Sequence, residues 1–268
     1  MSTTDVSAKD VMALRQKTGL GMMDCKKALI AHKGDAEAAE AALREQLKGK
    51  MDTRVDRPAG EGRVLTLVDG DKAVIVAFRA ETDFTARNEN FIAMTESAAK
   101  LLLEQEDGDV EFTDPIKQLL DEVRITTGEN LSMGRGNRLT GGKFGSYIHH
   151  DNKLGVLLQY EGDIDADVVT GICQHIAAHV PTPMAVQEEG VPQELVELKR
   201  GGAKAEAENS GKPAEIAEKI AEGKMRKFFE EVTLLGQKYV RDDTKQIREL
   251  LPSGASLKCF VRMQLEAE

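Results

Sequence analysis

Two histidines that lie four residues apart, His175 and His179, are the clearest candidates for metal chemistry in the sequence. In a helix this spacing places both imidazoles on one face, where they can share a metal ion. The zinc-protease motif also needs a glutamate directly after the first histidine, and Ile176 occupies that position. A metal hydrolase that combines the two histidines with Asp83 stays open. A histidine pair without an evident third ligand is, however, more often a packing or surface feature.

The glycine-rich stretch at residues 134–144 only partly matches the loops that bind nucleotide phosphates. Such a loop needs Gly, four residues and then Gly-Lys-Ser/Thr, so that backbone amides surround the phosphates. Here Lys143 comes one position late, and Phe144 stands where the magnesium-binding hydroxyl belongs. The dinucleotide fingerprint fails as well, because Leu139 replaces its third glycine. Ser and Cys nucleophile elbows are also absent from the sequence, which therefore disfavours an enzyme.

The three cysteines, Cys25, Cys173 and Cys259, lie far apart and do not have the spacing of metal ligands. An odd, scattered set of this kind is typical of reduced thiols in a reducing compartment, where a buried cysteine acts as a small hydrophobic residue. We therefore expect no metal site and no cofactor.

The pair Asp83-Phe84 indicates binding rather than covalent chemistry. Phe84 interrupts a polar run, and the common explanation would be a phenylalanine folded back onto its own core. The chain contains a duplicated pattern of strands and a helix, described below, and Phe84 lies in the loop between strand and helix of the first copy. That loop is longer than its equivalent in the second copy, which has only Glu161-Gly162-Asp163. A rigid aromatic residue on a lengthened loop is typical of a binding hot spot.

These residues must be positioned by the elements around them, and the first fifty residues predict three short helices. One begins near Val11 and stops at Gly19, one covers residues 25–31 with Asp24 as its cap, and one covers residues 36–47 with Asp35 as its cap. A bundle this small has little interior. We therefore expect at least one of the neighbouring residues Met22 and Met23 to be exposed.

Beyond a polar linker at residues 48–61, a pattern of strand, Asp-containing turn, strand and helix occurs twice. The first copy has strands at 63–68 and 73–79, helices at 91–103 and 116–126, and a further strand at 131–139. The second copy has strands at 145–149 and 154–160 and a helix at 166–180. This duplication predicts two related α+β subdomains with antiparallel sheets.

Two charged helical stretches, 193–208 and 213–227, have apolar stripes too thin to dock on a core, so they predict a protruding helical hairpin. A helix at 245–251 and a strand at 257–265 would end the chain. The predicted fold class is α+β, divided into a three-helix domain at 1–54, a subdomain at 55–144, and a subdomain at 145–268 that contains the inserted hairpin at 190–226.

The composition is that of an ordinary globular protein with an acidic balance. Hydrophobic residues make up 41% of the 268 positions, charged residues 31%, and the formal net charge is −10. Binding along a nucleic-acid backbone needs clustered Lys and Arg, so direct nucleic-acid binding is not expected. Since no apolar run approaches the ~20 residues that span a bilayer, and the N-terminus lacks the pattern of a signal or transit peptide, we expect a cytoplasmic protein that does not enter membranes.

Several motifs together resemble the bacterial translation elongation factor Ts family, in family order and over essentially the whole chain. The longest match covers residues 18–29, Thr-Gly-Leu-Gly-Met-Met-Asp-Cys-Lys-Lys-Ala-Leu. The others are Glu81-Thr82-Asp83-Phe84, Thr127-Gly128-Glu129-Asn130, Gly145-Ser146-Tyr147-Ile148-His149 and residues 211–225. The family motif Gln-Pro-Phe-Val departs here to Gln237-Lys238-Tyr239-Val240.

The resemblance implies a function, the release of GDP from elongation factor Tu, and a fold whose N-terminal domain is like ubiquitin-associated modules. It implies that Asp83 and Phe84, within the motif that Thr82 begins, enter the partner near its magnesium and phosphate site. The remaining implied contact residues are Arg15, Met22 and Met23 against the GTPase domain, Thr127 and Gly128 beside the inserted pair, and His149 against the C-terminal region of the partner. A homodimer or a heterotetramer with the partner stays open. So does an adaptor of the ubiquitin-associated type that binds other clients.

Overall fold

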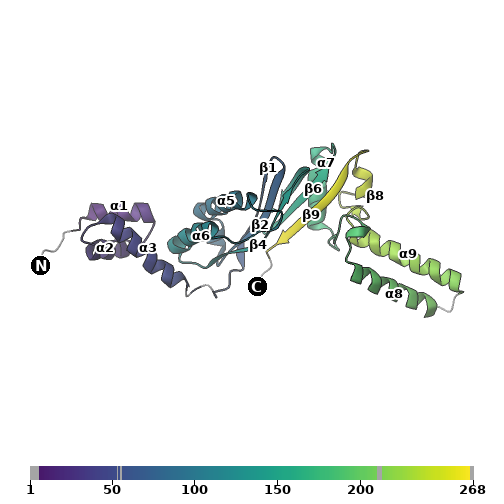
Figure 1. Cartoon of the computed structure of the whole chain (residues 1–268), viewed down its shortest axis with the longest axis horizontal. Coiled ribbons are helices and arrows are strands. Elements are labelled where there is room, and N and C mark those ends of the chain that lie inside the picture. Colours follow the sequence, from purple (N-terminus) through teal and green to yellow (C-terminus); the bar gives the residue numbers. More distant parts are fainter. Residues whose placement is uncertain (1–5, 53, 55, 210–212, 266–268) are drawn as a thin grey trace. The chain divides into compact units, whose positions relative to one another are not determined.

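The structure is a computed structural model, which describes residues 6–52, 54, 56–209 and 213–265 (Figure 1). The chain divides into two compact units. The first comprises Met1–Leu65, Val76–Gly136 and Leu265–Glu268, and the second comprises Thr66–Ile75 and Asn137–Gln264. The boundaries at 1–54, 55–144 and 145–268 remain a prediction about domains, but the α+β class, with N-terminal helices followed by sheet-containing regions, is confirmed.

The N-terminal helices are α1 (Ala8–Thr18), α2 (Met22–Ala31) and α3 (Ala36–Asp52). The first ends at Gly19, whose φ of 71° belongs to the left-handed conformation that glycine adopts without strain. The Asp35 carboxylate accepts from the backbone N–H groups of Glu37 and Ala38 at 3.0 Å, so its predicted role as a cap is confirmed. The helices pack around buried apolar side chains that include Leu14, Leu29 and Leu43.

Two details of this region were predicted wrongly. The second helix begins at Met22 with Gly21 at its N-cap, so Asp24 lies in the first turn and is not the cap. The third helix continues to Asp52, so the first residues of the predicted 48–61 linker are helical. Acidic residues favour both the N-cap and the first turn of a helix, where their charge meets the positive end of the helix dipole, so the sequence alone does not distinguish the two positions for Asp24.

The first sheet has the strand order β1-β2-β4-β3. It is formed by β1 (Glu61–Asp69), β2 (Lys72–Ala80), β3 (Gly108–Asp109) and β4 (Leu131–Thr140), with α4 (Asp83–Ala86), α5 (Glu89–Leu103) and α6 (Asp114–Thr127) between the strands in sequence. The two-residue turn at Gly70-Asp71 joins β1 and β2 as a hairpin. Buried side chains from these elements form a core: Phe78, Phe91, Leu102, Ile116 and Leu120.

The second sheet is antiparallel, with the order β5-β6-β9 formed by β5 (Lys143–Ile148), β6 (Leu154–Glu161) and β9 (Ser256–Gln264). Helix α7 (Ala166–Ala178) contributes the buried residues Ile172, Cys173 and Ile176 to the same core as Leu158 of β6. In both sheets a hairpin is followed by a helix, and the next long strand returns beside the second strand of the hairpin. This shared order confirms the predicted duplication.

The hairpin consists of α8 (Gln193–Asn209) and α9 (Ala214–Val232), seen side by side in green in Figure 1. Its base is packed by the buried residues Ala185, Val191, Val196 and Met225. Helix α9 ends five residues later than predicted. Of the joint predicted at 209–212, Asn209 is the last residue of α8, and residues 210–212 lie outside the described residues. The remaining short elements are η1 (Glu188–Gly190), β7 (Lys238–Tyr239), β8 (Asp242–Gln246) and η2 (Ile247–Leu250). The helix predicted at 245–251 is therefore a strand end followed by a 3-10 turn.

Candidate functional site

Phe84 is the most exposed aromatic side chain described, with 83% of its surface accessible to solvent. It lies on α4, a one-turn helix, where the sequence predicted a loop. Four residues are too few for a helical pattern to be visible in the sequence. The alternative in which Phe84 packs onto its own core is wrong, since its side chain is exposed, in contrast to the fully buried Phe78. An apolar side chain of this size is costly to leave in water, which favours a role in binding.

Thr82 holds the start of this helix. Its hydroxyl accepts from the backbone N–H of Thr85 at 3.3 Å, which is the N-cap contact, and donates to Oε1 of Glu129 at 2.7 Å. The backbone N–H of Thr82 donates to Oε2 of the same glutamate at 3.2 Å. Glu129 thus engages Thr82 through both carboxylate oxygens, and its own backbone N–H donates to the Thr127 hydroxyl at 3.4 Å.

A second glutamate, Glu81, connects the same two segments in the opposite direction, from the residue before Thr82 to the residue after Glu129. Oε1 of Glu81 accepts from the backbone N–H of Asn130 at 2.6 Å, and its Oε2 lies 3.6 Å from the Arg57 guanidinium. The Asn130 side-chain amide donates to the Arg57 carbonyl at 2.9 Å, and Arg54 donates to the Gly128 carbonyl at 2.6 Å. We call these contacts among residues 81–82, residues 127–130 and the two arginines the junction. The structure thereby brings Thr82, Thr127 and Gly128 together beside Asp83 and Phe84.

Sequence reasoning missed Glu81, Glu129 and Arg57 as parts of this site. Both glutamates belong to motifs that were identified, so their presence was visible. Their pairing was not, because Thr82 and Glu129 are 47 positions apart and only the folded chain brings them into contact.

Asp83 occupies the first position of α4, next to Phe84. Its carboxylate is half-exposed and lies 3.5 Å from the guanidinium of Arg87, one turn further along the chain. The Arg87 side chain is itself 81% exposed. An ion pair this open to water contributes little to stability, so the carboxylate can exchange this partner for another.

The predicted contact residues of the N-terminal helices are on the surface. Met22 and Met23 are 47% and 61% exposed at the start of α2, so the expectation that at least one faces solvent is confirmed. Arg15 is exposed near the end of α1. Met12 lies one turn before Arg15 and is also exposed, a residue that the sequence analysis did not single out. Adaptable methionines are common at protein-binding surfaces.

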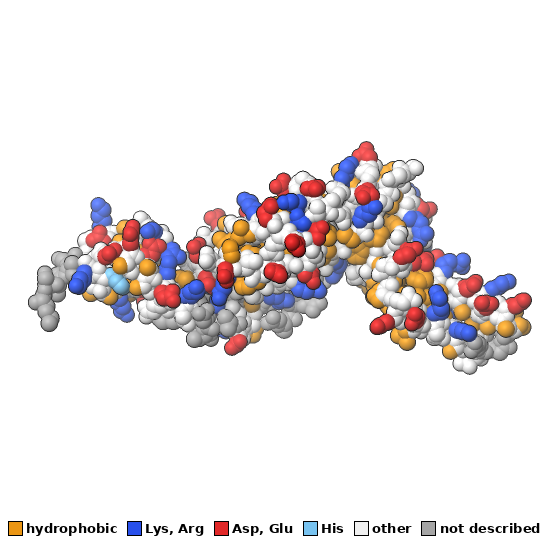
Figure 2. Space-filling view, in the orientation of Figure 1, with side chains coloured by type: hydrophobic (Ala, Val, Ile, Leu, Met, Phe, Trp, Pro, Cys, Tyr) orange, Lys and Arg blue, Asp and Glu red, His pale blue; other side chains and the backbone are white. Residues whose placement is uncertain are grey.

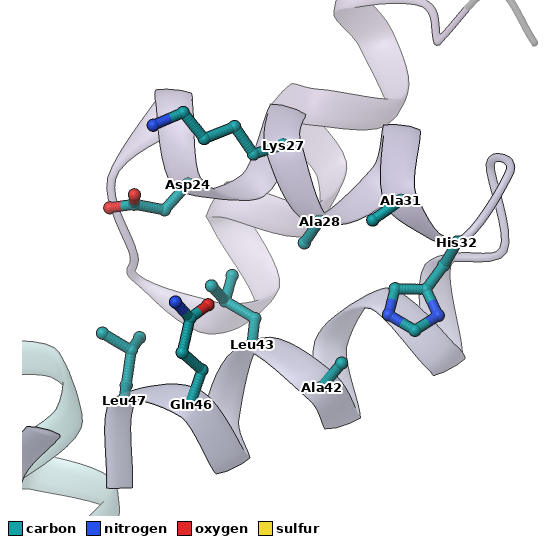
Figure 3. A pocket seen from close by; sticks show the side chains of 9 residues that line it. All are labelled: Asp24, Lys27, Ala28, Ala31, His32, Ala42, Leu43, Gln46 and Leu47. Carbon is teal, nitrogen blue, oxygen red and sulfur yellow. The ribbon is translucent and has the colours of Figure 1, made fainter. Parts of the chain in front are cut away.

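A small groove of about 380 Å³ lies between α2 and α3. Figure 3 shows Ala28 and Ala31 of α2, with His32 at the C-cap of that helix, above Ala42 and Leu43 of α3, with Asp24 and Gln46 toward one end. Arg15, Met22 and Met23 are not among its lining residues. The groove is therefore separate from the predicted contact surface of these helices.

His149 lies in the second unit, just after β5. Its Nδ1 atom is 2.9 Å from the Tyr147 hydroxyl, and its ring stacks edge-on against the exposed ring of His150 with centroids 4.2 Å apart. This contact orients the half-buried imidazole at the end of a strand, where part of it remains available to a partner.

His175, the first residue of the histidine pair, has a structural role. It is fully buried, its Nδ1 accepts from the Val240 backbone N–H at 3.2 Å, and its Nε2 lies 2.9 Å from Oε1 of Gln237. Burial lowers the pKa of its imidazole from 6.5 to about 4, so the ring is neutral at physiological pH. Because both ring nitrogens bind protein atoms, neither can ligate a metal.

The other described His, Cys, Asp and Glu side chains offer no metal site either. Among the described residues, no group of three or more His, Cys, Asp or Glu side chains is arranged to hold a metal ion. Burial raises the pKa of the Cys173 thiol to about 12, which leaves it protonated and unreactive. The metal-hydrolase interpretation based on His175, His179 and Asp83 is therefore not supported.

Charges are mixed over the visible surface. On the face in Figure 2, acidic and basic side chains are interspersed over the described residues. The formal net charge of the whole chain is −10. Within the described part of the chain, no helix is both long and apolar enough to cross a bilayer.

Comparison with known proteins decides the family. A family model described as elongation factor TS matches residues 81–267. Elongation factor Ts of Thioalkalivibrio sulfidiphilus is 38% identical, over 97% of this chain and 92% of its own length. The corresponding protein of Methylococcus capsulatus is also 38% identical with the same coverage, and that of Thiobacillus denitrificans is 39% identical over 94% and 89%. The chain belongs to the elongation factor Ts family.

As a member of the elongation factor Ts family, the chain is a protein of the translation machinery. The family match begins at Glu81, the first residue of the segment that carries the junction and Phe84. The elongation factor Ts relatives extend the similarity through the N-terminal helices that carry Met22 and Met23.

Proposed function

We propose that the chain is a guanine-nucleotide exchange factor that binds elongation factor Tu with GDP and promotes release of the nucleotide. The observation that carries the proposal is Phe84, an aromatic side chain 83% exposed on a one-turn helix that is held in place by hydrogen bonds to a second segment. Family membership supplies the partner. From the family resemblance we expect Asp83 and Phe84 to enter the partner near its magnesium and phosphate site.

Exchange of this kind is a shift of a binding equilibrium and involves no bond-breaking by the factor. The factor must bind the nucleotide-free partner more tightly than the GDP form, and GDP must then weaken the factor by the same ratio. Phe84 supplies volume that competes with the ordered nucleotide site. Asp83 supplies negative charge where phosphate had been favoured. Once its carboxylate leaves the exposed ion pair with Arg87, this charge repels the phosphates of GDP.

The other contacts follow from the same proposal. Arg15, Met22 and Met23 form a contact with the GTPase domain, and the exposure of the two methionines supports this role. Thr127 and Gly128 support the inserted pair, and His149 meets the C-terminal region of the partner. The protein would act in the cytoplasm as a binding protein without covalent chemistry.

The test is stopped-flow release of fluorescent GDP from elongation factor Tu. The chain should accelerate release, and Phe84→Ala should slow it by at least about tenfold at sub-saturating concentration, because a buried interface aromatic contributes on the order of 2–4 kcal/mol. Phe112→Ala is the matched control, since Phe112 is a half-exposed phenylalanine outside the motif and should leave release unchanged. No acceleration by the unaltered chain would overturn the proposal. Capture of different cytosolic clients instead would favour the adaptor alternative.

A further inference from the structure

We infer that Glu129 and Glu81 are positioning residues for exchange, which act by fixing the direction in which α4 presents Phe84. The inference rests on the proposed function and deepens it. Neither carboxylate needs to touch the partner for this role, since each binds the backbone or side chains of this chain.

The argument begins with the length of α4. A four-residue helix forms very few backbone hydrogen bonds to offset the entropy lost when its backbone becomes ordered. Isolated helices of this length therefore do not persist in water. The order of α4 must come from contacts with other parts of the chain, which include burial of Thr85 and hydrogen bonds at its N-terminal end. The N-terminal end depends on the Thr82 hydroxyl, which accepts from the Thr85 N–H.

Glu129 determines whether that hydroxyl is correctly oriented. A threonine hydroxyl has a single proton, and here it is donated to Oε1 of Glu129 at 2.7 Å. With the proton directed at the glutamate, the oxygen lone pairs remain for the Thr85 N–H. The Thr82 backbone N–H, bound to Oε2 of the same carboxylate, fixes the residue before the helix as well. Hydrogen bonds to an ionised acceptor are stronger than neutral ones, so this two-point contact defines the start of α4.

Glu81 completes the arrangement from the opposite direction. It precedes Thr82 in the sequence and binds the backbone N–H of Asn130, the residue that follows Glu129. Each segment therefore supplies a carboxylate that binds a backbone N–H of the other. Two crossed contacts of this kind resist both sliding and rotation of one segment against the other, whereas a single contact leaves rotation free.

The junction also reaches the segment that follows α3. Arg57 faces Glu81 at 3.6 Å and accepts from the Asn130 side chain through its carbonyl, and Arg54 binds the Gly128 carbonyl. The segment leading from the N-terminal helices is thus connected to the same site that directs Phe84. Loss of Glu129 or Glu81 should let α4 sample other directions without removing any predicted contact residue.

The experiment uses the full chain with Glu129→Gln, and Glu122→Gln as its control. Glu122 is an exposed residue of α6 whose carboxylate makes no ion pair or hydrogen bond to any described residue. In Glu129→Gln the maximal rate of GDP release should fall at least about fivefold, as loss of a charge-assisted hydrogen bond implies. The half-saturating concentration should change less than about twofold, because the contact residues are intact. Glu122→Gln should match the unaltered chain.

A second readout does not depend on exchange activity. Hydrogen–deuterium exchange of the peptide covering residues 81–87 should accelerate in Glu129→Gln, while the melting temperature stays close to that of the unaltered chain. Thr82→Val, which removes the hydroxyl, should likewise accelerate hydrogen–deuterium exchange of residues 81–87 with little change in melting temperature. Thr82→Ser, which retains the hydroxyl, should keep the protection of the unaltered chain. In the Phe84→Ala background, Glu129→Gln should add no further loss of release rate, since the side chain that it directs is gone.

Normal release rates and normal protection of residues 81–87 in Glu129→Gln would overturn the inference. So would a loss of release rate that adds to that of Phe84→Ala, because Glu129 would then act independently of Phe84. The failure of the proposed function has a different signature. In that case the unaltered chain does not accelerate GDP release at all, while hydrogen–deuterium exchange still reports whether Glu129 orders α4.

Discussion

At the scale of single residues, two phenylalanines six positions apart have opposite environments. Phe78 on β2 is fully buried, and Phe84 on α4 is 83% exposed. Phe84→Ala should therefore change the free energy of unfolding by less than about 0.5 kcal/mol, the usual range for a surface position. Phe78→Ala should cost roughly 3–5 kcal/mol, because it removes core contacts and leaves a cavity. Denaturant unfolding measures both, and a large loss of stability in Phe84→Ala would show that its ring packs inside.

His175 makes the stability of the chain depend on pH. Its folded-state pKa of about 4 is below the ordinary value of 6.5, so the unfolded chain binds the proton more readily. The full stability is present above pH 6.5 and is lost progressively as the pH falls toward 4. The linkage relation gives a loss of roughly 2 kcal/mol at pH 5.

Comparison of unfolding free energies for the unaltered chain and His175→Gln checks this pH dependence. The variant is expected to be less stable at pH 7.5, since Gln237 and Val240 lose their present partner. Its further loss between pH 7.5 and pH 5 should be smaller than that of the unaltered chain by roughly 2 kcal/mol. Equal losses in the two proteins would mean that His175 does not titrate on unfolding.

At the scale of elements, two glycines inside helices differ in the space around them. Gly201 lies in the middle of α8, and a Cβ atom added to it would meet nothing within 4 Å. Gly171 lies inside α7, where an added Cβ would collide with the Tyr239 hydroxyl. The first glycine only weakens its helix, whereas the second makes room for a packed aromatic residue.

Gly201→Ala should therefore stabilise α8 by about 0.5–1 kcal/mol, and Gly171→Ala should destabilise the second unit. Hydrogen–deuterium exchange in α8 measures the first effect, because the hairpin can open without unfolding the rest. Thermal unfolding measures the second. If Gly201→Ala instead accelerates exchange in α8, this glycine has a packing role that the surrounding space does not reveal.

The elements also show how far the sequence allows prediction. Most of the long helices and strands were predicted to within a few residues, because they carry a clear apolar pattern, as in α5 and β2. Helices α3 and α9 each end five residues later than predicted. Helix α4 was missed because its stability comes from Glu129, far away in the sequence, and not from its own four residues. The exposure of Phe84 was expected from the comparison of the two copies. The pairing of Glu81 with Asn130 was not, since no local pattern reports a contact between distant segments.

At the scale of the whole molecule, the predicted contact residues belong to both compact units. Arg15, Met22, Met23 and the junction are in the first unit, and His149 is in the second. This distribution separates two tasks under the proposed function. Contacts distant from the nucleotide, such as that of His149, supply affinity that does not depend on GDP. Phe84 and Asp83 supply the part of the binding that GDP opposes.

The division of tasks predicts how the affinity for elongation factor Tu depends on nucleotide. The unaltered chain should bind the nucleotide-free partner at least about tenfold more tightly than the GDP form, within the usual range of coupling between two ligands. Phe84→Ala should reduce this ratio to about threefold or less, because it removes the side chain that competes with the bound nucleotide. His149→Ala should weaken binding to both forms by a similar factor and leave the ratio unchanged. Titration calorimetry with each form of the partner measures all three. A ratio that His149→Ala lowers and Phe84→Ala preserves would transfer the nucleotide-sensitive contact from the first unit to the second.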